Sequence, residues 1–202
     1  TLANSSRTIF NGTAQTISGS SVPVFRLLVI NATSTVTLGT NISVTGASSN
    51  FGVYGTVDPG TLYQVSSTGL SRIYTGGKLK VYAANFNSNY LLTGTTTLYA
   101  GSVVDYCAAG DQVISAAYSY STLLINGSGV KSLSANLPPL YSKDNTNGKI
   151  YVNSGTFDLL GFTANRGTTK VGGELFIADG ALVKVGGTNN FPANFSVRTI
   201  GV

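Results

Sequence analysis

The chain lacks several residues on which common enzyme chemistry depends. Its 202 residues include no His, no Trp and no Met, and only one Cys and one Glu. Without His, neither a Ser-His-Asp nor a Cys-His arrangement can form. The single cysteine, Cys107, has no partner for an internal disulfide and no His with which to bind zinc. We therefore expect Cys107 to be a small buried hydrophobic residue.

Charge is also scarce. Only 9% of the residues are charged, the net charge is +5, and the basic residues are spread singly along the chain. Nucleic-acid grooves concentrate Lys and Arg on one face so that several phosphates are neutralised together. We therefore expect isolated, solvated surface charges and no nucleic-acid partner.

Long apolar runs and a leader segment are missing as well. No stretch approaches the roughly 18 apolar residues of a membrane-spanning helix, so we expect no membrane span. Residues 1–4 lack the charged and apolar regions of a signal peptide. If the protein is exported, as we expect, the chain is a mature form or a piece of a longer protein.

The residues that are present favour strands and turns. Apolar residues make up 42% of the chain, and Gly numbers 25, with Ser, Thr and Asn filling most polar positions. This apolar content argues against disorder, and the small polar residues suit pleated strands and tight turns. No window shows apolar residues at helical spacing. The composition predicts an all-β protein with almost no helix.

An internal repeat organises the chain. Three phrases return after 95 to 100 residues: 15–18 as 112–115, 28–31 as 123–126, and 55–58 as 155–158. The repeat predicts two units, 1–101 and 102–202, within one continuous solenoid. The polar segment 142–149 accounts for extra residues in the second unit, and we expect it to be a loop that projects from the wall. The ends resemble each other too, since 199–201 is similar to 1–3.

Short alternating segments separated by glycine turns define the expected strands. They lie at 7–10, 14–18, 25–31, 35–38, 42–45, 78–83, 95–100, 149–152, 156–160, 174–177 and 182–185. Two architectures fit this spacing, a right-handed parallel β-helix and an antiparallel β-sandwich. The repeat favours the β-helix, because a helix wall stacks like upon like. Five coils in each unit would give about 19 residues per coil.

The repeated phrases resemble the tandem β-helix repeats of very large surface adhesins of Bacteroidetes-type bacteria. The resemblance lies in the phrases and in their order, at 10–18, 28–31, 36–38, 41–46, 154–163, 177–181 and 186–195. It extends over most of the chain and is weakest at 63–92 and 138–149. It implies a right-handed parallel β-helix used as a stalk, fibre or adhesive surface outside the cell. It supplies no catalytic residues.

The acidic residues do not form a recognisable active site. Asp58 and Asp158 occupy equivalent repeat positions, whereas Asp105 and Asp111 flank a turn. Glycosidases need two carboxylates close together, and this spacing offers none. The segment 144–148 has the oxygen ligands of a calcium loop but lacks the later bidentate Glu, which favours a plain polar turn. We therefore expect no enzyme activity, no cofactor and no metal.

Two kinds of surface residue are candidates for interaction. Six sequons could carry N-linked glycans, at Asn4, Asn11, Asn31, Asn41, Asn126 and Asn194. The tyrosines could form an exposed stacking platform for sugars, or they could pack within the coils, which is the favoured interpretation. The tyrosines considered are Tyr54, Tyr63, Tyr74, Tyr82 and Tyr90.

Three functions fit the sequence. The first is a structural repeat segment of an extracellular adhesin, stalk or fibre, with neighbouring copies or flanking repeats as partners and end-to-end stacking as its mode of assembly. The second is a carbohydrate-binding or carbohydrate-cleaving module, with surface glycans as partners. The third is a pilus-like subunit of immunoglobulin type, which needs a strand near 1–10 that pairs outside its own chain.

Overall fold

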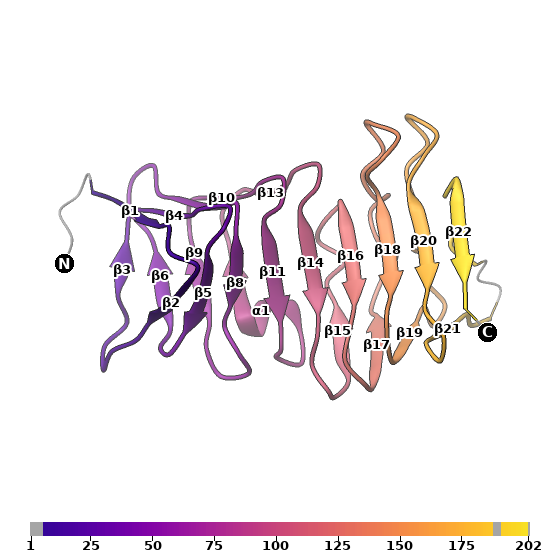
Figure 1. Cartoon of the computed structure of the whole chain (residues 1–202), viewed down its shortest axis with the longest axis horizontal. Helices are drawn as coiled ribbons and strands as arrows, with labels where there is room; N and C mark the ends of the chain where they lie inside the picture. Colours follow the sequence, from indigo (N-terminus) through magenta and orange to yellow (C-terminus); the bar gives the residue numbers. More distant parts are fainter. Residues whose placement is uncertain (1–5, 188–190, 202) are drawn as a thin grey trace. The chain divides into compact units, whose positions relative to one another are not determined.

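The chain forms two compact units, residues 1–102 and 103–202. The computed structural model describes residues 6–187 and 191–201 (Figure 1). Regular structure within these residues is almost entirely β, and the one helix among them is the four-residue α1 (Phe86–Asn89). The expected scarcity of helix is confirmed.

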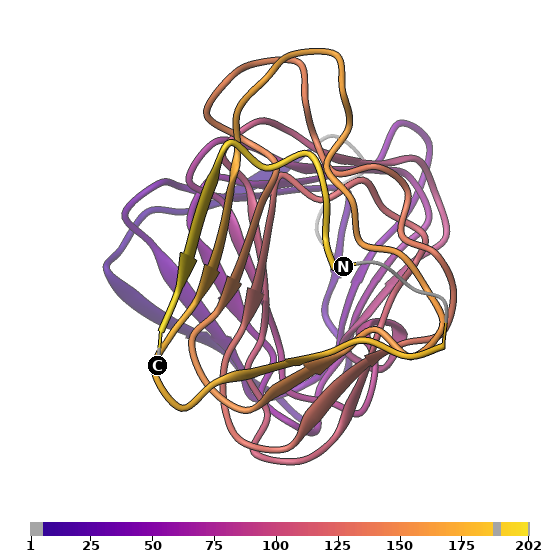
Figure 2. The same cartoon turned by 90° about the vertical axis from the view of Figure 1, so that its right-hand side faces the viewer.

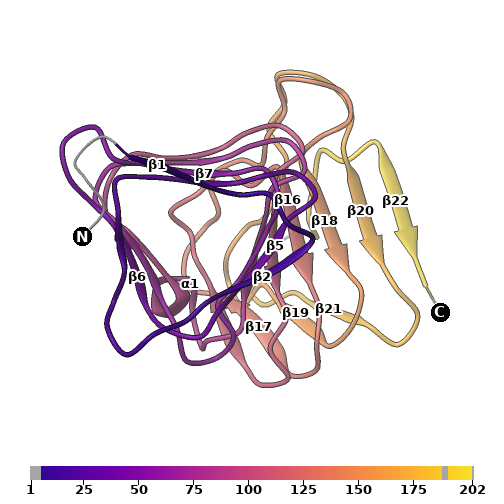
Figure 3. The ribbon, with the colours of Figure 1, turned by 60° about the vertical axis from the view of Figure 1, so that its left-hand side comes forward.

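Unit 1 consists of coils whose strands stack into three parallel sheets (Figure 3). The first sheet contains β1 (Arg7–Phe10), β4 (Leu27–Ile30), β7 (Asn50–Val53), β10 (Leu70–Ile73) and β13 (Thr96–Leu98). The second contains β2 (Ala14–Ile17), β5 (Thr35–Leu38), β8 (Thr56–Asp58) and β11 (Lys78–Val81). The third contains β3 (Val24–Phe25), β6 (Ile42–Val44), β9 (Val65–Ser67) and β12 (Tyr90–Leu92).

Unit 2 has two such sheets, and its coils wind around a common interior (Figure 2). Buried side chains fill this interior. One sheet contains β14 (Val103–Tyr106), β16 (Thr122–Ile125), β18 (Lys149–Val152), β20 (Glu174–Ile177) and β22 (Val197–Ile200). The other contains β15 (Gln112–Ile114), β17 (Val130–Leu133), β19 (Thr156–Asp158) and β21 (Leu182–Lys184). A single parallel bridge joins Leu140 and Arg166 outside these strands.

The strand pairs within each unit are parallel and in register, as in Arg7 with Leu27 and Val103 with Thr122. The parallel β-helix is therefore confirmed, and the antiparallel sandwich is wrong. The expected strand at 25–31 is divided by a corner at Arg26. Coils are also longer than expected, because Thr122 and its partner Lys149 lie 27 residues apart, whereas Val103 and Thr122 lie 19 apart.

Columns of apolar side chains form the core. In unit 1, Ile30, Val53 and Ile73 are partners on successive coils and are fully buried. In unit 2, Ile125 and Val152 are likewise partners on successive coils and are fully buried. Because alternate residues of each strand point inward, one aliphatic residue per strand extends the column by one coil. Burial of this apolar surface stabilises the wall by roughly 25 cal/mol per Å².

One lysine lies inside this core, which corrects the expectation that all charges are solvated. Lys131 is 0% exposed and stands between Gln112 and Phe157 in an inward column. Its ammonium group donates hydrogen bonds to the carbonyls of Ala108, Gly110 and Ser128 at 2.8, 2.7 and 2.6 Å. Because an ammonium group has three N–H donors, these carbonyls satisfy it completely.

A buried arginine joins two long loops of unit 2. The loops precede β18 and β20 and project from the wall (Figure 1), and the first is the projecting loop expected at 142–149. Arg166 is 1% exposed. Its guanidinium group donates to the carbonyls of Asn147 at 2.9 Å and Asp144 at 2.5 Å in the first loop, and to those of Gly167 and Lys170 in the second. One side chain thus fixes both loops.

Candidate functional site

Three stacked tyrosines form a ladder on the outside of unit 1. Tyr54, Tyr74 and Tyr99 directly follow β7, β10 and β13. Their ring centroids are 4.2 and 5.0 Å apart along the ladder, and adjacent ring planes differ by 4° and 2°. The backbone N–H of Tyr74 donates to the carbonyl of Val53, which continues the strand register through the ladder. Tyr54 and Tyr99 remain 37% and 38% exposed.

The tyrosines considered in the sequence divide between the two expected roles. Tyr54 and Tyr74 belong to the exposed ladder, whereas Tyr90 is buried and donates its hydroxyl to the carbonyls of Val57 and Lys80. Tyr63 and Tyr82 are half-buried. Sequence reasoning did not single out Tyr99. A shared signal was present, however, because each ladder tyrosine follows a buried aliphatic residue at the end of a strand.

A hollow of about 290 Å³ lies beside the ladder. It exists because Gly52 occupies an outward position between Val29 and Arg72 on the neighbouring coils and has no side chain to fill it. A Cβ atom built on Gly52 would lie 3.7 Å from the Tyr74 ring, at ordinary contact distance. The hollow is lined by Arg7, Leu27, Val29, Asn50, Gly52, Tyr54 and Tyr74.

Polar groups line this hollow and a second one next to it. The Asn50 carboxamide oxygen is buried and has no hydrogen-bond partner within the described residues. The second hollow, of about 340 Å³, shares Arg7 and Tyr54 with the first and is otherwise lined by Asn31, Ala32 and Thr33. Burial and the neighbouring Tyr74 raise the pKa of Tyr54, against the opposing effect of Arg7 and Arg72. The Tyr54 hydroxyl is therefore a neutral hydrogen-bond donor at neutral pH.

Positive charge dominates unit 1. Its five basic residues are accompanied by one acid, Asp58. That carboxylate accepts a hydrogen bond of 2.9 Å from Lys80 on the next coil. Among the residues that the structure describes, Arg7 and Arg72 are consequently left without a carboxylate partner. Both lie close enough to Tyr54 to influence its pKa.

The acids considered as catalytic candidates bind neighbouring coils. Asp58 pairs with Lys80, and the equivalent Asp158 lies 3.8 Å from Lys184. Two others flank a turn in unit 2. Asp105 accepts from the Asn126 side chain at 2.7 Å, and Asp111 accepts from the backbone N–H of Val130 at 2.8 Å. In the described ranges no cluster of three Cys, Asp or Glu side chains could hold a metal.

Lys149, Tyr151 and Glu174 form a polar row across β18 and β20. The Tyr151 hydroxyl donates to Glu174 at 2.6 Å, and the Lys149 ammonium lies 4.0 Å from the same carboxylate oxygen. Burial and the hydrogen bond to Glu174 raise the pKa of Tyr151. A tyrosine that serves as a general base needs a lowered pKa, so this geometry does not favour sugar cleavage.

The candidate calcium loop is closed by its own carboxylate. Asp144 accepts from the backbone N–H groups of Thr146 and Asn147 at 3.0 and 2.8 Å. Burial tends to raise the pKa of Asp144, but the hydrogen bonds from Asn147 and Thr146 outweigh it and lower the pKa. This arrangement is an Asx-type turn.

The sequons differ in accessibility. Asn11 and Asn31 are exposed directly after β1 and β4, and Asn41 is exposed before β6. The side-chain nitrogens of Asn126 and Asn194, in contrast, donate to Asp105 and to the Arg166 carbonyl. Asn4 lies outside the described residues, as does the 1–3 segment of the terminal match. Glycosylation remains a prediction, and Asn11, Asn31 and Asn41 are its most accessible positions.

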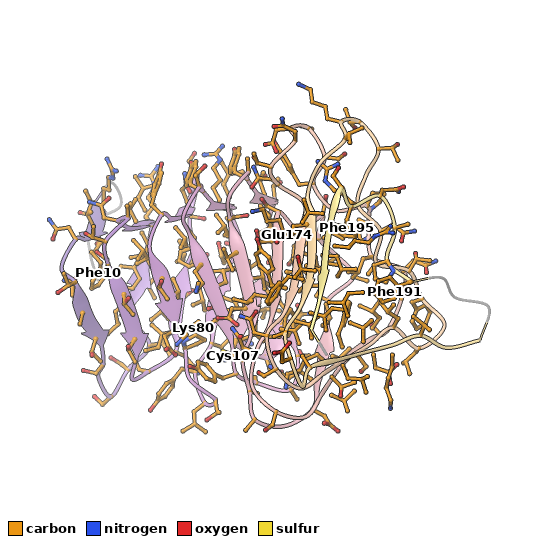
Figure 4. All side chains as sticks on the ribbon, turned by 45° about the vertical axis from the view of Figure 1, so that its right-hand side comes forward. Phe10, Lys80, Cys107, Glu174, Phe191 and Phe195 are labelled. Carbon is orange, nitrogen blue, oxygen red and sulfur yellow. The ribbon has the colours of Figure 1, made fainter. Side chains whose placement is uncertain are left out.

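Cys107 differs from expectation. It directly follows β14 and is half-buried, not fully enclosed (Figure 4). The repeat places it, at an offset of 97 residues, in the position of Phe10, which is itself half-buried at the end of β1. The repeat therefore placed Cys107 correctly, but the expectation that this position is buried was wrong.

These features define the molecule as a β-solenoid protein with an aromatic ladder on its outer surface. No protein-family model matches the chain, and no curated protein or solved structure matches it either. Across the residues that the structure describes, no helix has the length and apolar character needed to cross a membrane.

Proposed function

We propose that the chain is a structural β-solenoid segment of an extracellular surface adhesin, stalk or fibre. The observation that supports this role is the continuous in-register pairing of successive coils within each unit. Each coil satisfies the backbone groups of its neighbours along the wall. A wall of this kind resists extension and can continue through any number of repeats.

The use of charged side chains supports the same role. Asp58 and Asp158 pair with lysines on the next coil, and Lys131 and Arg166 bind backbone carbonyls of adjacent turns. An enzyme gathers such groups around a reacting atom. Here they are distributed along the wall, where each one joins neighbouring segments.

Flanking repeats or copies of the chain are the proposed partners. Ile200 continues the buried column of Val152 and Ile177 on β22 but is 59% exposed. A further coil would cover it if that coil also supplied acceptors for the inward-pointing Arg198 of the same strand. The pilus-like alternative is less well supported, because β1 pairs with β4 of its own chain over four residues.

Surface labelling tests the proposal. Antibodies raised against the purified protein should label intact producing cells, and protease added outside the cells should remove the label. A cytoplasmic protein serves as the control and should stay unlabelled until the cells are lysed. Labelling that appears only after lysis would contradict an extracellular role.

Extension under force tests the mechanical part. Single molecules held by their ends should resist unfolding and then lengthen in steps that correspond to whole units or groups of coils. A chain that lengthens smoothly at low force would not serve as a stalk.

A further inference from the structure

We propose that the outer surface of unit 1 binds an acidic glycan, with a sugar ring in the Gly52 hollow and its carboxylate on Arg7. The site consists of the two hollows that share Arg7 and Tyr54. It goes beyond the structural role and does not depend on it. The argument rests on shape, on unsatisfied polar groups and on charge.

The shape of the first hollow suits a sugar ring. Its volume of about 290 Å³ lies just below the range of pockets for drug-sized ligands, roughly 300–1,000 Å³, and suits a ligand as small as one sugar ring. Leu27 and Val29 provide apolar surface, and Tyr54 and Tyr74 border it with aromatic rings. Sugars present C–H groups on their ring faces, which pack against such surfaces, while their hydroxyls point outward to polar groups.

One buried hydrogen-bond acceptor in the hollow lacks a partner that a glycan would supply. The Asn50 carboxamide oxygen is buried without a partner, so turning it toward a sugar hydroxyl breaks no existing bond of that oxygen. A buried acceptor without a donor costs about 1–3 kcal/mol, and a ligand that supplies the donor recovers that energy. The Tyr54 hydroxyl and the Arg7 guanidinium add donors on the same side.

The charge of the site favours an acidic sugar over a neutral one. Among the described residues that line the two hollows, none carries a carboxylate. Arg7 lines both, and Arg72 lies beside Gly52 on the next strand. The planar guanidinium group binds a carboxylate through two parallel hydrogen bonds, and this pairing is stronger than one between neutral groups. A uronic or sialic acid has the required carboxylate beside ring hydroxyls.

The adjacent hollow extends the site beyond one sugar. Asn31 and Thr33 offer an amide and a hydroxyl next to the outer ring face of Tyr54. A second ring placed there would share Arg7 with the first. The site therefore accommodates two linked sugars, and the protein for testing should carry no glycan on Asn31.

Glycan binding and site filling together test the proposal. Purified protein is applied to an array of uronate- and sialate-containing oligosaccharides, each printed beside its neutral counterpart, and the best acidic binder is measured by titration calorimetry. We expect the acidic form to bind at least about tenfold more tightly than the neutral form. Gly52→Val should fill the hollow and weaken binding at least about tenfold. Its thermal midpoint should be unchanged or higher, because Gly weakens a strand.

Charge variants separate specific binding from general attraction. Arg7→Gln should weaken acidic binding by about tenfold or more, whereas Lys143→Gln, which removes an exposed charge from unit 2, should leave it unchanged. Gly52→Ala provides a smaller filling step should the valine variant fail to fold. The proposal is overturned if no acidic glycan binds, if neutral counterparts bind equally, or if both Gly52 variants bind like the original protein. These results do not depend on where the protein is located in the cell.

Discussion

The buried Lys131 side chain connects neighbouring turns of unit 2 through hydrogen bonds made inside the solenoid. Its stem continues an inward column between Gln112 and Phe157, and its ammonium group reaches three carbonyls at the adjoining turns. Gln112 assists by accepting from the backbone N–H of Ala108 at 3.1 Å. Burial lowers the pKa of Lys131, although Asp111 acts in the opposite direction. The cation is tolerated because each of its protons has an acceptor.

Replacing this lysine should therefore destabilise unit 2. In Lys131→Met the stem is retained, but the three carbonyls lose their common donor. We expect the free energy of unfolding to fall by about 2–3 kcal/mol, as for loss of hydrogen bonds to a buried charged group, measured by urea denaturation. Lys143→Met, at an exposed position of the same unit, should change it by less than about 0.5 kcal/mol. Equal stability of the two variants would show that the carbonyl contacts contribute nothing.

Two buried tyrosines make stability sensitive to alkali. The Tyr106 hydroxyl lies 3.3 Å from that of Tyr120 and accepts from the backbone N–H of Ser115. Burial raises the pKa of Tyr106 to about 12, well above its usual value of 10.0. The unfolded chain then loses this proton first as pH rises. The contribution of the protonated Tyr106 hydroxyl to the free energy of unfolding is complete below pH 10 and is lost as pH increases through about 12.

Tyr106→Phe should reduce this alkaline loss. At neutral pH the variant should be less stable by about 1 kcal/mol, because Ser115 loses its acceptor. Between pH 9 and 11 its stability should fall less steeply than that of the original protein, as followed by denaturant unfolding at each pH. Tyr120 retains part of the effect, since burial also raises its pKa. Tyr99→Phe, at an exposed position, is the control and should keep the original slope.

At the scale of elements, each strand is ordered by pairing with strands of adjacent coils, and the two projecting loops of unit 2 are ordered by contacts with each other. The two projecting loops of unit 2 belong to adjacent coils and are joined through Arg166. Asp144 completes the first loop by closing its own turn. The Arg166 side chain and a backbone hydrogen bond from the Gly173 N–H to the Asn145 carbonyl connect the two loops.

Arg166→Met should release both loops together. We expect faster amide hydrogen exchange at 143–148 and 167–172, and a loss of about 3 kcal/mol in the free energy of unfolding, because four carbonyls lose a charged donor. Lys170→Met, which removes an exposed side chain from the second loop, should leave exchange in the first loop unchanged. Exchange that increases in only one loop of Arg166→Met would contradict the coupling.

A strand could be predicted from the sequence only where its own residues alternate between apolar and polar. Strands with clear alternation, such as β5 and β20, and the projecting loop at 142–149 were recognisable. Strands such as β7, with a glycine, and β9, with two serines, were not, because their order comes from pairing with adjacent coils. The burial of Arg166 left no trace in the sequence pattern, whereas the 95-residue repeat places Lys131 at the position of Val36, a buried residue.

The candidate site could be predicted only in part, because it too depends on which residues of adjacent coils lie side by side. Tyr54 and Tyr74 were considered as a platform, but their stacking with Tyr99 needs the register of three coils. Those coils differ in length, since the ladder tyrosines are 20 and 25 residues apart. The hollow depends on the absence of a side chain at Gly52, which has meaning only once its neighbours across the sheet are known.

At the scale of the whole molecule, β22 places a charged side chain in line with an inward column of the preceding strand. It pairs with β20 on one side, and within the described residues no strand pairs with its other edge. Arg198 stands at the position that Leu175 occupies in the preceding coil. An inward-pointing charge on an edge strand makes docking of another apolar coil unfavourable unless that coil supplies acceptors.

Arg198→Leu should therefore promote self-association. We expect the variant to form larger species at lower protein concentration than the original chain, as measured by sedimentation velocity over a concentration series. Lys143→Leu removes an exposed charge away from β22 and should sediment like the original protein. Unchanged sedimentation of Arg198→Leu would show that this charge does not protect the edge.

The unequal coil lengths indicate that the chain can accept inserted residues, both in evolution and by engineering. The strands of unit 2 keep their register although successive partners lie between 19 and 27 residues apart, because the extra residues enter loops outside the wall. New peptide segments can therefore be added at these corners with little effect on the pairing that holds the coils. The wall thus provides a fixed frame for displayed sequences, and foreign epitopes inserted between Ser20 and Ser21, in the exposed turn between β2 and β3, would test that capacity.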